Sequence, residues 1–461
     1  MSIDRAADGV MGELACTRRG VLRAAGVGGI GALIGSLAGV GLSAVDALPA
    51  DAATDDYRAL VCVFLFGGND GYNMLVPTDA AGYSAYAKAR DNLAVARTSL
   101  VPLQAAGAPD LGLHPSLAPL GKVFHGGHLG VVANVGSLLA PTRKADYKAG
   151  RNLPPALFSH NDQQTEWMLG TSAGVASGWA GRLADLMTPA GNQGLSMNIS
   201  LGGTNLFETG SVVAPYTLGP KGGVDFTTLR NPSRAALINQ NWARAAGGGD
   251  PFQAYLGRRY AAARDLSAHI TSVLGATPAL RTAIPNTVFG NELAQVARMI
   301  HARKALGARR QIFFVGMGGF DTHAGQVAGQ PRLFDELSSA LAAFYAATAE
   351  MGVAKQVTTF THSDFGRTLT SNGAGSDHGW GSHHLVMGGA VRGGRIYGEL
   401  PELALGAPLE VGSGRFIPTT SVDSYAATLA RWFGARASDV HTLFPRLSRF
   451  GHTNVSFLPT H

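Results

Sequence analysis

The sequence has 461 residues, of which 46% are hydrophobic and 15% are charged. This composition is typical of a globular protein and excludes a disordered or fibrous one. The formal net charge of +6 is a mild excess for this length, and the basic residues form no arm or stripe, so we expect no nucleic-acid partner.

The first 52 residues are organised like an export signal. Arg18 and Arg19 form a basic pair, an apolar run rich in glycine and alanine follows from Ala24 to Ala44, and small residues end it. This order predicts a cleaved signal peptide, and the paired arginines indicate the twin-arginine route. The alternative is a membrane anchor, which the many glycines of the run disfavour. We therefore expect the twin-arginine export machinery as a partner, no stable membrane anchor after cleavage, and a periplasmic or secreted protein.

Residues 53–461 are expected to form a single α/β domain. Short apolar runs with the length of buried strands alternate with helical patterns, which predicts a doubly wound, mostly parallel sheet covered by helices on both faces. The less regular stretch near 190–290 is interpreted as an insertion or a cap on the sheet edge. The apolar runs are 59–66, 129–135, 311–317, 356–361 and 384–388, and the helical patterns are 115–124, 291–306 and 331–351.

Three of these strands end in a loop that carries an aspartate, namely Asp70, Asp321 and Asp364. The carboxyl ends of parallel strands lie at one edge of a sheet, where the three carboxylates would repel each other unless a cation neutralised them. A metal ion is the simplest such cation, because aspartate and histidine are its usual ligands. The alternatives are a turn for Asp70, a helix cap for Asp321 with His323, and an ion pair with Arg367 for Asp364.

The strongest signal is the glycine-rich segment from Asp377 to His384, which contains His378, His383 and His384. Four ionisable groups in so short a loop favour a site over a packing role. His383 and His384 are adjacent at the start of a strand, so one of the two should point away from the site.

A second candidate region runs from residue 158 to residue 166. Ser159 stands just before a helix start, where backbone N–H groups suit an anionic substrate, and it could act as a metal-activated nucleophile. The alternative is that Ser159 or Asn161 simply caps the helix.

Together these motifs resemble a known secreted family, the domain-of-unknown-function family fifteen-oh-one. That family is more remotely similar to the alkaline phosphatase and sulfatase superfamily. Members of that superfamily place one or two metal ions at the sheet edge and cleave phosphate or sulfate esters through a Ser, Thr or modified Cys nucleophile. Besides the twin-arginine start, the matching segments are Phe64–Gly71, Gly112–Pro115, Ser159–His160, Gly319–His323, Ser363–Arg367 and Asp377–Gly379.

The resemblance implies a nucleophile and a set of metal ligands. Ser159 is the nearest match for the nucleophile, and without a cysteine near it a formylglycine-type sulfatase is not expected. Phe365 stands where many superfamily members carry a metal-binding histidine, and His378 is the candidate replacement. The ligands that the resemblance implies are Asp70, Asp321, His323, Asp364 and one of His383 and His384.

Two functions follow from these observations. The first is an exported metal-dependent hydrolase of phosphate or sulfate esters, with Arg367 holding the anionic group of the substrate. Its cofactor would be a divalent metal, zinc first, with calcium or manganese as alternatives. The second is a non-catalytic exported binding or assembly protein on the same scaffold. Phe365 in place of a ligand favours the second function, and the histidine cluster favours the first.

Overall fold

A computed structural model of the chain describes residues 56–105, 109–170, 176–188, 192, 194–219, 229, 231–451 and 455–459. Residues 1–52, to which the export signal was assigned, lie outside this described part. Within it, no helix combines the length and the apolar character needed to cross a membrane.

Strand β1 (Arg58–Leu65) lies in the middle of a large sheet, between β8 (Arg310–Met317) and β9 (Val357–Ser363), and is parallel to both. In the described chain the sheet has nine strands in the order β11-β5-β10-β9-β1-β8-β6-β7, with β12 beside β5. Of these, β10 (Ser382–Met387) alone runs antiparallel to its neighbours, β9 and β5 (Leu129–Gly136). The mostly parallel sheet expected from the sequence is confirmed. The remaining strands are β6 (Asn198–Ser200), β7 (Tyr216–Thr217), β11 (Ile396–Tyr397) and β12 (Thr420–Ser421).

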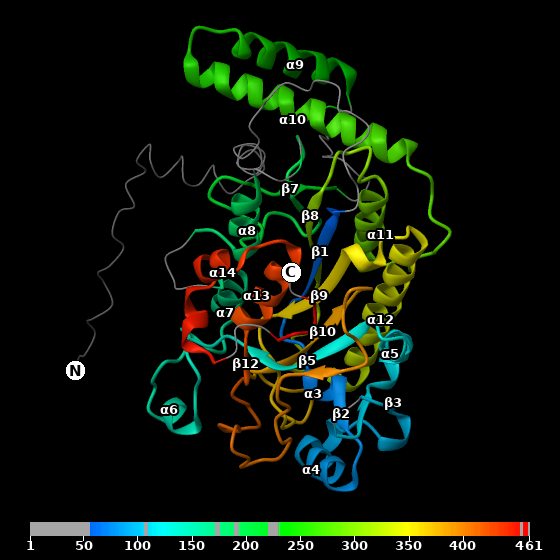
Figure 1. Cartoon of the computed structure of the whole chain (residues 1–461), viewed down its shortest axis with the longest axis vertical. Helices are drawn as coiled ribbons and strands as arrows, with labels where there is room; N and C mark the ends of the chain where they lie inside the picture. The colour runs from blue at the N-terminus through cyan, green and yellow to red at the C-terminus, as the bar shows by residue number, and fades with distance from the viewer. Residues whose placement is uncertain are drawn as a thin grey trace, which may run out of the picture.

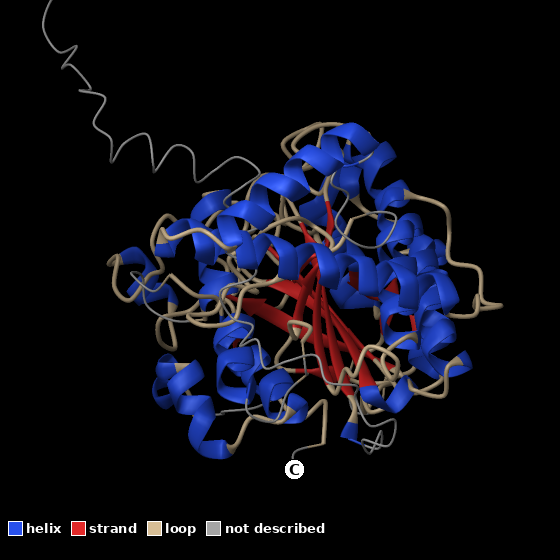
Figure 2. Ribbon diagram, turned by 90° about the horizontal axis from the view of Figure 1, so that it is seen from above, coloured by secondary structure: helices blue, strands red, loops and turns tan. Residues whose placement is uncertain are grey.

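Helices cover both faces of this sheet (Figure 2). Successive residues of a strand point to opposite faces, so Val61 and Val63 enter one buried core while Cys62 and Phe64 enter the other. The first core also contains residues of α5 (Ala118–His125), α11 (Val288–His301) and α12 (Gln326–Glu350). The second contains residues of α7 (His160–Leu169), α8 (Trp179–Met187), α13 (Val422–Phe433) and α14 (Ala437–Leu443). The doubly wound α/β architecture is therefore confirmed.

Two long helices, α9 (Pro232–Ala246) and α10 (Pro251–Ala276), lie together at one end of the molecule (Figure 1). Trp242 of α9 stacks on Tyr260 of α10, with ring centroids 5.1 Å apart. At the opposite end a small antiparallel sheet has the strand order β2-β4-β3. The elements not yet given are α3 (Gly71–Met74), β2 (Leu75–Pro77), α4 (Ala80–Arg90), β3 (Val101–Leu103), β4 (Leu111–Leu113) and α6 (Lys144–Lys148).

The core next to β6 contains a buried carboxyl group, that of Glu208. Its Oε2 accepts a hydrogen bond of 2.8 Å from Asn205, while Oε1 has no partner in the described chain. Because burial penalises the charged form, it raises the pKa of Glu208 to about 8.

This raised pKa predicts a pH-dependent stability. A glutamate with a higher pKa in the folded state contributes stability at low pH that is lost as pH rises through the folded pKa. We expect the free energy of unfolding to fall as pH increases from about 4.5, the ordinary pKa of a glutamate, to about 8, by up to about 1.4 kcal/mol per pH unit between these values. Urea unfolding of Glu208→Gln should be less pH-dependent in this range. The exposed control Glu402→Gln should behave as wild type, and an unchanged slope in Glu208→Gln would contradict the assignment.

Candidate functional site

The carboxyl ends of β9, β1 and β8 lie side by side, so the loops that follow them meet at one edge of the sheet. These loops carry Asp364, Asp70 and Asp321. The loops approach closely at Gly67, which has a φ of +114°; a Cβ there would lie 2.3 Å from the backbone nitrogen of Asp321. A glycine is therefore needed for β1 to end against the Asp321 loop.

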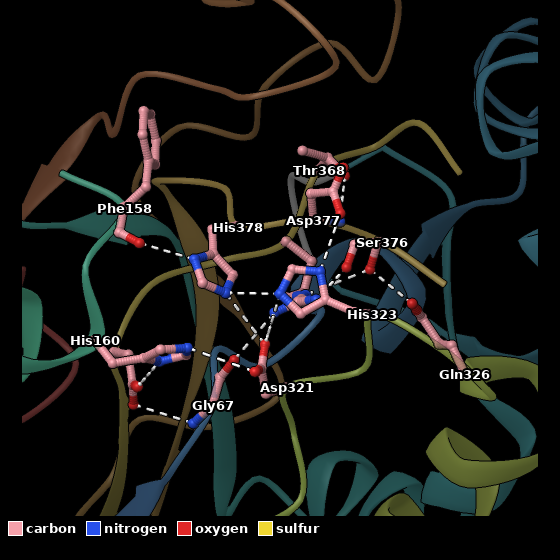
Figure 3. Close-up of polar contacts among 12 residues, drawn as sticks. Gly67, Phe158, His160, Asp321, His323, Gln326, Thr368, Ser376, Asp377 and His378 are labelled. Carbon is pink, nitrogen blue, oxygen red and sulfur yellow. Dashed lines mark hydrogen bonds and ion pairs between the residues drawn. The ribbon is translucent and has the colours of Figure 1, made fainter. Parts of the chain in front are cut away.

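The side chains of His160, Asp321 and His378 converge at this edge (Figure 3), with one possible ligand atom of each within 4.8 Å of the others. His378 Nε2 lies 3.2 Å from Asp321 Oδ1, and His160 Nε2 lies 3.6 Å from Asp321 Oδ2. His323 joins them, with Nε2 at 3.1 Å from Asp321 Oδ1 and at 2.8 Å from His378 Nε2. We call these four residues the His–Asp cluster.

In each histidine of the cluster the other ring nitrogen, Nδ1, faces an oxygen atom of a residue that does not belong to the cluster. A carbonyl or carboxylate oxygen only accepts, so a proton on Nδ1 satisfies each of these contacts, and in a neutral ring of that tautomer Nε2 keeps a lone pair that faces the cluster. The three contacts are His160 Nδ1 to Asp364 Oδ2 at 2.5 Å, His378 Nδ1 to the Phe158 carbonyl at 2.7 Å, and His323 Nδ1 to Asp377 Oδ1 at 3.0 Å.

Arg367 is buried beneath the cluster and fixes Asp321. Its Nη1 donates to Asp321 Oδ1 at 2.7 Å and to the Gly67 carbonyl at 3.2 Å, and its Nη2 donates to the Ser376 carbonyl. Burial alone would raise the pKa of Asp321, but the hydrogen bond and positive charge of Arg367 outweigh it, and the pKa is lowered. Asp321 is thus a charged carboxylate, and Arg367, expected from the sequence to hold a substrate anion, donates to protein acceptors.

Asp364 takes part in the site through His160. It is fully buried, and besides the His160 contact it accepts hydrogen bonds from Gly67 N at 3.2 Å and Gln164 Nε2 at 3.0 Å. The next residue, Phe365, packs its ring against two cluster histidines, with centroid distances of 4.9 Å to His160 and 4.5 Å to His378. Asp364 therefore fixes the orientation of the His160 ring.

Asp70 lies at the same sheet edge but has other partners. Its carboxylate pairs with the fully buried Arg90, accepts from Gln326 Nε2 at 2.6 Å and caps α3 through the backbone N–H groups of Tyr72 and Asn73. These four donors make Asp70 the anchor between the β1 end, α3 and α4.

The structure also leaves His383 and His384 out of the cluster. Burial lowers the pKa of His383 to about 4 and that of His384 to about 3, so both are neutral. His383 Nδ1 accepts from the backbone of Asn134 at 3.1 Å, and the His384 ring packs 4.7 Å from that of Trp167. Both side chains support the sheet and its helix cover.

Two residues of the site were not assigned their roles from the sequence. The sequence groups His160 with the histidines near the aspartate loops and beside Ser159, but it does not indicate that His160, the first residue of α7, reaches Asp321. Asp377 was counted in the glycine-rich segment, but its pairing with His323 needed the fold. Ser159 itself donates its hydroxyl to Asp162 Oδ2 at 2.6 Å.

The cluster is open to solvent. The side chain of Asp321 is 44% exposed, and those of His323, His160 and His378 are 43%, 31% and 20% exposed. Burial lowers the pKa of His378, which favours its neutral, lone-pair form. A ligand can therefore reach the nitrogens and the carboxylate from outside.

Residues 57–414 match a family described as "Protein of unknown function (DUF1501)". No curated protein matches the sequence. Among solved structures, the PsFucS1 sulfatase from Pseudoalteromonas sp. is similar at 10% identity and a TM-score of 0.31, covering 74% of this chain, which spans 64% of that protein. Ps i-CgsB in complex with k-i-k-neocarrahexaose has 10% identity and a TM-score of 0.31, covering 86% and 77% of the two chains. BT1596, a 2-O GAG sulfatase, has 11% identity and a TM-score of 0.30, covering 88% and 76%.

The Asp70–Arg90 pair generates a prediction, because both side chains are inaccessible to solvent. Removing one partner leaves the other charge buried and unpaired, so Arg90→Met should lower the free energy of unfolding by about 3–5 kcal/mol. The double variant Asp70→Asn with Arg90→Met should lose less than the sum of the single variants in urea unfolding. Additive losses would show that the two side chains do not depend on each other.

Proposed function

This chain belongs to the DUF1501 family, and we propose that it is an exported metal-dependent hydrolase of phosphate or sulfate esters. The observation that carries the proposal is the approach of His378 Nε2 and His323 Nε2 to 2.8 Å of each other, beside the charged Asp321. With both Nδ1 atoms protonated and both rings neutral, two lone pairs and a carboxylate face one another. A metal cation held between them would relieve this repulsion, as would a proton shared by the two Nε2 atoms, and metal analysis distinguishes the two.

The donor set fits zinc best. Two or three imidazole nitrogens with one carboxylate oxygen are common zinc ligands, whereas calcium and magnesium take oxygen. Four ligands around a tetrahedral zinc ion lie about 3.3 Å apart. The distances of 3.1, 3.2 and 3.6 Å from cluster nitrogens to Asp321 bracket that value, and the Nε2 atoms of His323 and His378, which lie 2.8 Å apart, would have to separate slightly for both to bind the ion. The outer contacts of His160 with Asp364 and of His378 with the Phe158 carbonyl are the kind that orient metal-binding histidines.

The residues of the chain have distinct parts in the proposed reaction. Asp321 supplies the negative charge, Arg367 holds that carboxylate in place, and Asp364 sets the ring of His160. A divalent ion held there would polarise an ester oxygen and lower the pKa of a water molecule. Ser159 remains the candidate nucleophile on the chain, and on attack its hydroxyl proton would pass to Asp162, whose Oδ2 accepts its hydrogen bond at 2.6 Å.

The first test is metal content. Protein purified without chelator from metal-replete cells should carry about one equivalent of a divalent metal by elemental analysis. Chelation should lower its melting temperature. Metal at about a hundred times its dissociation constant adds about 3 kcal/mol to the free energy of unfolding, and the chelator removes that contribution. His378→Ala and Asp321→Asn should abolish metal retention, because each removes a ligand. The exposed His441→Ala is the matched control and should keep the metal.

Activity is then tested on the metal-loaded protein with chromogenic aryl phosphate and aryl sulfate esters. Wild-type protein without stoichiometric metal, and with the same melting temperature in chelator, would contradict the metal-dependent proposal. Loss of metal in His441→Ala would indicate a site elsewhere.

A second candidate function is a non-catalytic exported binding or assembly protein. The observation that favours it is that the two expected substrate-handling groups are already engaged, Ser159 by Asp162 and Arg367 by Asp321, Gly67 and Ser376. Metal retention without turnover of either ester class would select this function.

We also propose export through the twin-arginine machinery, on the basis of Arg18 and Arg19 followed by the apolar run. The variant with both arginines changed to lysine should remain in the cytoplasm at precursor length, because the receptor reads the arginine pair. Immunoblots of cell fractions measure this. Normal arrival of the variant in the periplasm or medium would contradict the route.

A further inference from the structure

Arg415 stands at the rim of the His–Asp cluster on a loop that is held rigidly. The loop runs from Glu410 to Phe416, which form an isolated antiparallel bridge. The buried carboxylate of Glu410 accepts hydrogen bonds from the backbone nitrogens of Gly412 at 2.7 Å and Gly414 at 2.9 Å. A buried carboxylate satisfied by backbone N–H groups fixes the turn, so the backbone of Arg415 is fixed with it.

The side chain of Arg415 is fixed by the cluster histidine His378 and by Phe158, the residue that orients this histidine. Its Nε donates to the backbone carbonyl of His378 at 2.8 Å, and its guanidinium lies 4.8 Å from the ring centroid of Phe158. The carbonyl of Phe158 in turn accepts from His378 Nδ1 at 2.7 Å. Arg415, Phe158 and His378 therefore form one connected unit.

The terminal nitrogens of Arg415 differ from those of Arg367. Within the described residues, neither Nη1 nor Nη2 of Arg415 makes a hydrogen bond or ion pair with the protein, while both terminal nitrogens of Arg367 donate to protein acceptors. The Arg415 side chain is half-buried, so its planar fork is reachable from solvent. A guanidinium that is held by its Nε and by an aromatic ring, with its fork free, is arranged for bidentate binding of an oxyanion at little cost in side-chain entropy.

We propose that Arg415 binds the tetrahedral oxyanion of the substrate, a sulfate or phosphate group, beside the His–Asp cluster. This rests on the proposed hydrolase function and assigns to Arg415 the role that the sequence suggested for Arg367. Arg367 then serves to position Asp321, and Arg415 makes the site selective for anionic esters over neutral ones.

The test measures the affinity of the purified full-length mature protein for inorganic sulfate and inorganic phosphate by isothermal titration calorimetry. Each anion is titrated with and without bound metal. Arg415→Met should weaken binding of the preferred anion about 10–100-fold, because it removes a charge-assisted bidentate contact. The anion affinity of Arg415→Lys should lie between those of wild type and Arg415→Met, because lysine keeps the positive charge but lacks the forked guanidinium.

The matched control is Arg332→Met. Arg332 is an exposed arginine whose Nε also donates to a backbone carbonyl, that of Ala328 at 3.1 Å. The Arg332→Met protein should bind both anions with the affinity of wild type. Melting temperatures and metal content of every variant identify loss of folding or of metal, and Arg415→Lys preserves the test if Arg415→Met does not fold.

The outcomes are distinct for the two proposals. Absence of metal from wild-type protein contradicts the proposed hydrolase, whatever the anion affinities are. Unchanged anion affinity in Arg415→Met and Arg415→Lys, equal loss in Arg332→Met, or no saturable anion binding by wild type would overturn the role of Arg415. The anion that binds more tightly to wild type, and loses more in Arg415→Met, identifies the ester class.

Discussion

The hydrogen bond from Arg367 to Asp321 joins the buried interior to the solvent-exposed histidines. A guanidinium buried at this depth is costly unless its charge and its N–H groups are matched. The acceptors come from three separate places: Gly67 at the end of β1, Asp321 after β8, and Ser376 in the segment before β10. One buried cation thus fixes the relative positions of the loops that form the site, and Asp321 stands where the histidines can meet it.

Around that carboxylate, the histidines are held through their Nδ1 atoms by acceptors of different kinds. Asp364 is fully buried, the Phe158 carbonyl is part of the chain before α7, and Asp377 is half-exposed. The ring of His160 is therefore held most firmly, since its acceptor is itself fixed by Gly67 N and Gln164. His323 is the most exposed of the three rings, so its contact is the one most easily exchanged for a ligand or a water molecule.

The sequence was sufficient for the architecture and for part of the site. Alternating residues of β1 serve two cores, and continuous apolar runs of this kind predict strands buried on both faces, as the structure confirms. Asp70, Asp321 and Asp364 were expected at one sheet edge because the carboxyl ends of parallel strands lie there. What each aspartate does could not be predicted, because Arg90, His160 and Arg367 reach them from distant segments. The adjacent His383 and His384 illustrate the limit, since both are buried and only the fold determines what surrounds them.

The reversed direction of β10 has a consequence for how the rim of the site can vary. Because β9 ends and β10 begins at the same edge, the chain between Ser363 and Ser382 leaves the sheet and returns to it at one place. That excursion carries His378, yet both of its ends are fixed by neighbouring paired strands. The middle of this excursion, residues 370–375, can therefore change in length and composition without altering the pairing of the sheet, whereas Asp364, Arg367 and Ser376 are tied into the site. A segment anchored in this way is suited to exchange between related chains, which would carry a different rim onto an unchanged framework.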